Sequence, residues 1–275
     1  MKNGLTKLLV IVFIVCSTAT LGQALEGKVV DANSGQLLVY VNVGVVGTSI
    51  GTITNSQGKF SLDIGKQPLS SILRLSMIGY QSQEFVVSDL LNEAIIELVE
   101  TPILLDVVTV KPKKFVKKRV GTKSTSKLTV TGWSGVGKGY ENGIKIKVKN
   151  SVYLETLYFY IATNDFDSVL LRLHIKKIVN DIPAEEMLTE NILIPVSIKS
   201  GWVNVDLKKC NLSYSQNFAL TLEWLEAWGG NEMPNLLLSM SIFKGNIYSK
   251  VASEAEWTIF ENKSPGIYLD VLESK

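Results

Sequence analysis

Residues 51–64 read GTITNSQGKFSLDI, and this stretch decides the fold of the N-terminal part of the chain. Phe60, Leu62 and Ile64 alternate with polar residues, which is the pattern of a strand with one buried face. The tetrapeptide Asn55–Gly58 ahead of them is typical of a tight turn, because its glycine can adopt positive φ without steric cost. It carries no carboxylate, so we interpret it as a turn and not as a calcium loop. The stretch therefore predicts two β-strands that meet at a turn.

The same strand and turn pattern extends to both sides of this stretch. Short alternating or β-branched segments, separated by Gly, Asn and Ser, lie at 27–31, 39–45, 48–54, 59–64, 72–77, 84–87 and 94–98. Short strands at regular spacing with turn residues between them indicate an all-β sandwich. Gly58 and Gly79 fall where tight turns need positive φ.

Several motifs of this block occur together in a fixed order. They are Gly27-x-Val29-x-Asp31, Val41-Asn42-Val43, Gly47-Thr48, Gly51-Thr52-x-Thr54-Asn55-x-x-Gly58-x-Phe60-x-Leu62 and Leu75-Ser76-Met77-Ile78-Gly79-Tyr80. In this order they closely resemble the carboxypeptidase regulatory-like domain, also called transthyretin-like, over residues 25–101. The resemblance implies a seven-stranded β-sandwich and a regulatory appendage without peptidase activity. Such domains are common at the N-terminus of envelope proteins, including TonB-dependent outer-membrane receptors, in which a short strand like 105–110 follows.

Residues 128–275 carry a second set of strand patterns. They include the long aromatic segment 152–161, the cleanly alternating segment 201–207 and segment 218–228, which places Trp224 on an apolar face. No helical period persists, so we predict a jelly-roll-like β-sandwich of eight or nine strands. The chain as a whole is expected to be all-β.

The N-terminus has the pattern of a secretory signal peptide over residues 1–24. Lys2 and Lys7 precede the apolar run 8–15, and small residues follow up to Gly22 and Ala24, either of which fits a cleavage site. Lipidation at Cys16 is the alternative, although the residues before it are not small. We expect an exported protein that is periplasmic or associated with the outer membrane. Removal of residues 1–24 leaves 26 basic and 26 acidic residues and the single cysteine Cys210.

Charge is distributed unevenly between these blocks. Residues 25–110 carry a net charge of −5, residues 111–127 carry +8 with no acid, and residues 128–275 carry −3. We interpret residues 102–127 as a basic linker between the two domains. Residues 111–127 could also contact an anionic membrane surface peripherally, since clustered lysines are attracted to acidic headgroups. An exported chain with a balanced charge is not expected to bind nucleic acid.

Trp228 is the candidate for ligand binding. It ends a strand and runs into Gly229-Gly230, so that one ring face could stay uncovered, with Asn231 and Glu226 as hydrogen-bonding neighbours. The alternative is that Trp228 folds back as a buried anchor of the loop. Strict alternation would place Glu223 and Glu226 on opposite strand faces, which argues against a glycosidase pair.

Few other residues suggest chemistry. His174, the only histidine, shares a predicted solvent face with Arg172 and Lys176, so we expect it to be exposed. Asp165 and Asp167 lie in a predicted loop and form a weak calcium candidate, with a polar hairpin that binds no ion as the alternative. Two histidines and a carboxylate, as zinc carboxypeptidases need, are not present, and we expect no cofactor.

Together these patterns favour a non-catalytic, exported binding or accessory protein of the cell envelope. Its partner would be an envelope protein or a glycan. A carbohydrate-binding β-sandwich is the first alternative, which a row of exposed aromatic residues would support. A component associated with a TonB receptor is the second. An enzyme would need a cleft with converging polar groups, which the sequence does not reveal.

Overall fold

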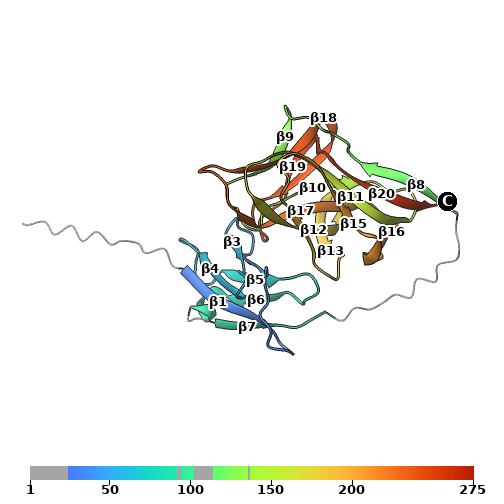
Figure 1. The fold of residues 1–275 in the computed structure, drawn as a ribbon. Coiled ribbons are helices and arrows are strands. Elements are labelled where there is room, and N and C mark those ends of the chain that lie inside the picture. The colour runs from blue at the N-terminus through green and yellow to red at the C-terminus, as the bar shows by residue number, and fades with distance from the viewer. Residues whose placement is uncertain (1–23, 92–93, 102–113, 136) are drawn as a thin grey trace, which may run out of the picture.

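The computed structural model describes residues 24–91, 94–101, 114–135 and 137–275, and it is all-β (Figure 1). Within these ranges there is no α-helix, and no helix is long and apolar enough to cross a membrane. The signal-peptide pattern lies almost wholly outside the described residues, so it stays a prediction.

The first domain is a sandwich of seven strands. They are β1 (Ala24–Asp31), β2 (Asn42–Val45), β3 (Gly51–Ile53), β4 (Lys59–Asp63), β5 (Ile72–Ser76), β6 (Gln83–Val86) and β7 (Ala94–Leu98), with the 3-10 turn η1 (Val87–Leu90) before β7. One sheet has the order β4-β1-β7 and the other β3-β2-β5-β6. Side chains such as Phe60, Leu62 and Leu75 fill the core between them. The predicted sandwich is confirmed.

The predicted turns are also confirmed. Asn55 Oδ1 accepts hydrogen bonds from the main-chain N–H of Gln57 at 2.9 Å and of Lys59 at 3.1 Å. Gly58 and Gly79 have φ of +65° and +87°, a region that L side chains rarely adopt.

The second domain contains thirteen strands, more than the eight or nine expected. They are β8 (Phe115–Gly121), β9 (Val130–Ser134), β10 (Glu141–Ile146), β11 (Val152–Asn164), β12 (Ser168–Val179), β13 (Ile182–Glu186), β14 (Ile192–Val196), β15 (Gly201–Asp206), β16 (Ser213–Tyr214), β17 (Phe218–Trp228), β18 (Asn235–Lys250), β19 (Thr258–Pro265) and β20 (Ile267–Ser274), with the 3-10 turn η2 (Lys208–Cys210). Short edge strands such as β13 and β16 account for part of the excess, because so few residues leave little periodic pattern.

These strands form two antiparallel layers joined by the 16-residue strand β18. Its first half pairs with β11, and its second half pairs with β10. The layer order is β13-β12-β17-β10-β18 on one side and β18-β11-β20-β8 on the other. The apolar face of each layer points into a shared core, in which Phe159, Leu173 and Trp224 are buried as the alternation of their strands predicts.

The predicted linker, residues 102–127, falls in two parts. Residues 102–113 lie outside the described residues. Residues 115–121 form β8, which pairs with β20 along its whole length. Ordered pairing within the second domain therefore begins before residue 128. The basic residues at 117–119 are compatible with a strand, because β8 is an edge strand from which lysine and arginine side chains reach solvent.

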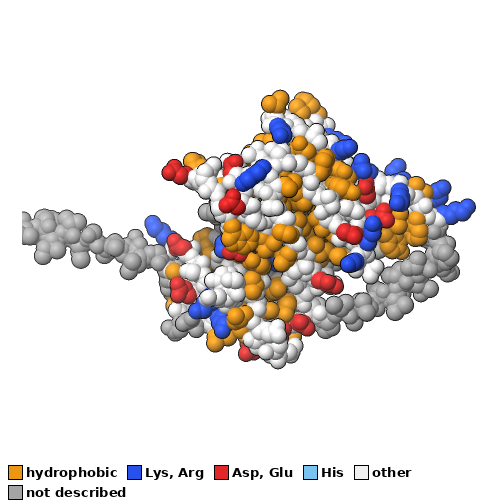
Figure 2. Space-filling view, in the orientation of Figure 1, with side chains coloured by type: hydrophobic (Ala, Val, Ile, Leu, Met, Phe, Trp, Pro, Cys, Tyr) orange, Lys and Arg blue, Asp and Glu red, His pale blue; other side chains and the backbone are white. Residues whose placement is uncertain are grey.

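The two domains pack directly on each other. A Cβ atom added to Gly44 would lie 2.8 Å from Glu254 and Ser253 side-chain atoms, and one on Gly79 would lie 2.8 Å from the oxygen of Thr189. Ile78 of the first domain belongs to the apolar cluster of the second. Hydrophobic side chains gather where the two domains meet on the face shown in Figure 2. This contact covers one outer sheet face of the second domain.

Candidate ligand-binding cavity between the domains

A row of four charged residues crosses the covered sheet face. Arg172 on β12 is opposite Glu223 on β17, Glu223 is opposite Glu141 on β10, and Glu141 is opposite Lys250 on β18. All are buried or nearly so, with Arg172 fully inaccessible. Two carboxylates directly opposite each other repel, so the cations at the two ends of the row are needed to hold them there.

The next positions along β12 complete a buried ionic cluster. His174 Nε2 lies 2.7 Å from Glu223 Oε2, and His174 Nδ1 lies 2.5 Å from Glu186 Oε2. Lys176 Nζ lies 3.4 Å from Glu186 Oε2 and 3.6 Å from Glu141 Oε1. Glu186 is fixed in turn, because its Oε1 accepts three main-chain N–H bonds, from Ile175, Met187 and Leu188.

The geometry requires a protonated His174. A neutral imidazole has one N–H, and its other nitrogen would direct a lone pair at a carboxylate oxygen. Burial and the charge of Lys176 lower the pKa of His174, but the carboxylates of Glu141 and Glu186 outweigh them and raise it above its ordinary value. Burial raises the pKa of Glu186, but His174 and Lys176 bring it down to about 2. His174 is therefore an imidazolium clamped between two carboxylates.

The expectation of an exposed His174 is wrong. Its exposed fraction is 3%, and those of Arg172 and Lys176 are 0% and 9%. The alternation of β12 correctly places the three residues on the face opposite Leu173 and Ile175. That face does not reach solvent, since the first domain and β13 cover it and carboxylates from three other strands pair with the cations.

Tyr40 joins the first domain to this cluster. Arg172 Nη2 donates a hydrogen bond to the main-chain oxygen of Tyr40 at 2.6 Å, and the Tyr40 hydroxyl donates to Glu226 Oε2 at 2.8 Å. Tyr40 has φ of +62°, which is uncommon for a residue with a side chain. The buried Thr54 hydroxyl holds the loop, since it donates to Leu38 O and accepts from Val41 N–H.

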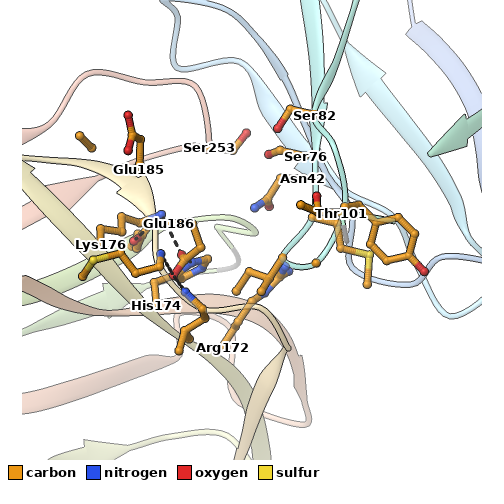
Figure 3. Close-up of a pocket in the computed structure, with 18 of the residues that line it drawn as sticks. Asn42, Ser76, Ser82, Thr101, Arg172, His174, Lys176, Glu185, Glu186 and Ser253 are labelled. Carbon is orange, nitrogen blue, oxygen red and sulfur yellow. Dashed lines mark hydrogen bonds and ion pairs between the residues drawn. The ribbon is translucent and has the colours of Figure 1, made fainter. Parts of the chain in front are cut away.

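A cavity of about 470 Å³ lies between the domains above the cluster (Figure 3). The first domain contributes polar residues such as Asn42, Ser76 and Ser82, and the second contributes the charged residues of β10, β12, β13 and β18. Arg172 Nη1 and Asn42 Oδ1 are buried there without a hydrogen-bond partner among the described residues. The cavity has the size of a small-molecule site and carries unused polar atoms.

Glu226 lies on the same face as Glu223, so the expected opposite placement is wrong. The pairing of β12 with β17 shifts register between Leu170 and Leu171, which places Leu225 in a bulge. One extra residue reverses the facing of the residues that follow it. Glu226 therefore points toward the first domain, where it accepts the bond from Tyr40.

The other two residues of the predicted ligand site are Trp228, the last residue of β17, and Asn231, in the loop that follows. Trp228 is half-exposed, at 47%. Asn231 Oδ1 accepts a hydrogen bond from the main-chain N–H of Met233 at 3.1 Å. Since Glu226 is bonded to Tyr40, both polar side chains of the predicted site, those of Glu226 and Asn231, have partners within the protein. A ligand role for Trp228 stays a prediction.

The remaining sequence candidates lie apart from the cavity. Asp165 Oδ2 accepts from the main-chain and side-chain nitrogens of Asn235, and Asp167 Oδ1 lies 3.7 Å from Lys199 Nζ. No group of three or more His, Cys, Asp and Glu residues suited to a metal ion occurs in the part of the chain that is described. Cys210 is half-buried, and burial raises the pKa of its thiol.

Comparison with known families agrees with the first sandwich. Residues 25–110, one part of the 275-residue chain, match the family described as CarboxypepD_reg-like domain. The first sandwich is a CarboxypepD_reg-like domain. This family is non-catalytic, and within this chain the CarboxypepD_reg-like domain supplies one wall of the cavity. No curated protein matches the chain.

Solved structures resemble the chain only remotely. The T13 viral particle of infectious bursal disease virus is 11% identical, with 90% of this chain and 60% of that chain covered and a TM-score of 0.24. The Gt strain of the same virus is 11% identical over 85% and 60%, with a TM-score of 0.22. This chain thus spans about three fifths of the structures it matches, and such scores carry no argument about its function.

The residue pattern did not predict the cavity or most of the residues that line it. Glu141, Glu186 and Lys250 are far apart in sequence and belong to three different strands. One signal was present, because three basic residues at alternate positions of one strand favour carboxylates at the facing positions of neighbouring strands. It could have indicated a paired, covered face, but not which carboxylates pair with it.

Proposed function

We propose that this protein is an exported, non-catalytic binding protein of the cell envelope that holds a small polar ligand in the cavity between its domains. One observation carries the proposal: polar atoms from both domains, Asn42 Oδ1 and Arg172 Nη1, are buried at the cavity without a described partner. Buried polar groups are normally hydrogen-bonded, so unpartnered atoms on two walls of one cavity favour a bound ligand or ordered water.

The state of the charged groups supports binding without catalysis. A general acid or base must be free to exchange a proton with a substrate. Both nitrogens of His174 are bonded to carboxylates, and Glu186 is engaged on both oxygens. The cluster is built to hold its charges in place.

Native purification tests the proposal. A ligand bound in the cavity should be released on denaturation and identified by mass spectrometry. Ser82 is exposed at the cavity rim, so Ser82→Trp should narrow the opening without disturbing the core and should remove the released compound. The matched control is Ser88→Trp, an exposed residue of the same domain outside the cavity. A release that is equal in Ser82→Trp and the wild type would contradict the proposal.

Export and contact with the envelope belong to the same proposal. The signal-peptide pattern of residues 1–24 and the eight basic residues of segment 111–127 support it. In that segment Arg119 is paired with Asp270 at 2.9 Å, whereas Lys117 has no ion-pair partner among the described residues. Cell fractionation followed by crosslinking tests the location. An outer-membrane receptor among the crosslinked neighbours would make the protein an accessory component of that receptor.

A glycan-binding face is the second candidate, and a row of aromatic rings favours it. Tyr158, Tyr160, Trp202 and Tyr268 lie side by side on the outer face of the second layer, with neighbouring ring centroids 4.7–5.2 Å apart. Arg119 covers Tyr268, and the other three rings are half-buried. Aromatic faces with polar neighbours are suited to sugar rings. Trp202→Ala should abolish retention on a polysaccharide gel if this face binds glycan, and unchanged retention would exclude it.

A further inference from the structure

The charges buried at the floor of the cavity do not cancel. Arg172, Lys176 and Lys250 are cationic, and the two carboxylates that clamp His174 require it to be cationic as well. Against these four stand three carboxylates, those of Glu141, Glu186 and Glu223. The nearby pair of Arg74 and Glu254, 3.7 Å apart, adds no net charge. Within this buried set the cations therefore outnumber the carboxylates by one. A further carboxylate on the same face, that of Glu226, is only half-buried and is already bonded to the Tyr40 hydroxyl.

The charged groups of the cluster have hydrogen-bond donors left over. Glu186 is saturated by main-chain N–H groups and His174, and Glu141 accepts from the Thr221 hydroxyl and faces two lysines. The carboxylates of Glu186 and Glu141 are thus engaged within the protein. Donors remain, because Arg172 Nη1 has no partner among the described residues and Lys176 makes only a long 3.4 Å bond. What the floor lacks is an acceptor that carries negative charge.

We propose that the cavity binds a small organic acid whose carboxylate or phosphate group lies between Arg172 and Asn42. The inference rests on the proposed function and adds the class of ligand. Asn42 and Ser253 face the same space with side-chain oxygens that lack described partners (Figure 3), so they can bond hydroxyl or amino groups on the rest of the molecule. A volume of about 470 Å³ admits a metabolite-sized molecule and excludes a folded chain.

Isothermal titration calorimetry of the full chain tests the inference with four probes. Inorganic phosphate and succinate represent the two acid groups, glucose a neutral polyol and methylammonium a cation, all at matched ionic strength. We expect saturable binding of at least one acid and none of glucose or methylammonium. Which acid binds distinguishes a phosphorylated from a carboxylated ligand.

Asn42→Asp is the decisive variant. Aspartate has nearly the same shape as asparagine, and its carboxylate adds a negative charge at the proposed anion site. This carboxylate should repel the acid group of the ligand and take its place near Arg172. Acid binding should weaken at least tenfold while the melting temperature is maintained. The control Lys209→Gln removes an exposed cation in the 3-10 turn η2, away from the cavity, and should leave binding unchanged.

The outcomes separate the two proposals. Saturable binding of glucose or methylammonium that Ser82→Trp removes would support the cavity as a ligand site and overturn the acid ligand. Failure of both acids to bind, or equal acid binding by Asn42→Asp and the wild type, would also overturn it. If natively purified protein also releases no compound, the proposed function falls as well.

Discussion

Arg172 in the second domain donates a hydrogen bond at 2.6 Å to the main-chain oxygen of Tyr40 in the first. Tyr40 returns a bond to the second domain through its hydroxyl, 2.8 Å from Glu226 Oε2. The residue is therefore held at its main chain and at its ring, in a left-handed conformation that a side chain disfavours. Tyr40 therefore bonds to the second domain through two of its groups, two residues before Asn42, which lines the cavity.

The Tyr40 hydroxyl should stabilise the domain contact measurably. Tyr40→Phe is expected to lower the free energy of unfolding by about 1 kcal/mol, the typical net value of one hydrogen bond. Glu226→Ala should cost a similar amount, and the double variant less than the sum, because both changes remove the same bond. Urea unfolding of the four proteins gives the coupling. Full additivity would show that the two side chains do not interact in solution.

Gly44 tests the packing of the domains without backbone strain, since its φ is not positive. A larger side chain there meets Glu254 and Ser253 of the second domain, so Gly44→Val should destabilise the full chain by about 1–3 kcal/mol, as overpacking does. It should also raise the radius of gyration measured by X-ray scattering. Ser49→Val, at an exposed loop position of the same domain, is the control. An unchanged radius would mean that the domains do not pack at Gly44.

Much of the fold could be predicted because it depends on local patterns. Turn residues such as Asn55 and Gly58, followed by the alternation of Phe60 and Leu62, define strands within a few residues of sequence. Trp224 was placed correctly in the core for the same reason. The excess strands of the second domain were not predictable, because β16 has only two residues and is defined by its pairing with β11.

The candidate site could not be predicted, because alternation gives the face of a side chain but not what covers that face. Arg172 and His174 were assigned to the correct face, and only the packing of a second domain makes that face buried. The bulge at Leu225 is likewise invisible in the residue pattern, yet it brings Glu226 to the interface. A long-range carboxylate partner such as Glu141 leaves no trace in the sequence around β12.

Trp228 should behave as a partly buried surface residue. At 47% exposure, Trp228→Ala is expected to cost less than about 2 kcal/mol, compared with roughly 3–5 kcal/mol for a buried aromatic. Trp224→Ala, which truncates a core ring on the same strand, supplies that upper reference. Thermal unfolding of both variants decides the role. A loss at Trp228 as large as that at Trp224 would identify a buried anchor and exclude a ligand platform.

The clamp on His174 should make stability depend on pH in a defined direction. The pKa of His174 is raised in the folded protein, so its charged form contributes stability that is fully present below the unfolded value of about 6.5. That contribution is lost as pH rises through the folded pKa. The carboxylates act at the other end, since the pKa of Glu186 is lowered to about 2 and its contribution is lost as pH falls from about 4.5 toward that value.

His174→Gln isolates the histidine contribution. At pH 6 the variant should be less stable than the wild type by about 3–5 kcal/mol, the usual cost of breaking a buried ion pair. The difference should shrink as pH rises above 6.5 toward the raised folded pKa, because the unfolded wild type has then released the proton that the folded protein still binds. Urea unfolding of both proteins from pH 5.5 to pH 9.5 measures this. Parallel curves across that range would mean that His174 does not change protonation on unfolding, and the imidazolium clamp would have to be abandoned.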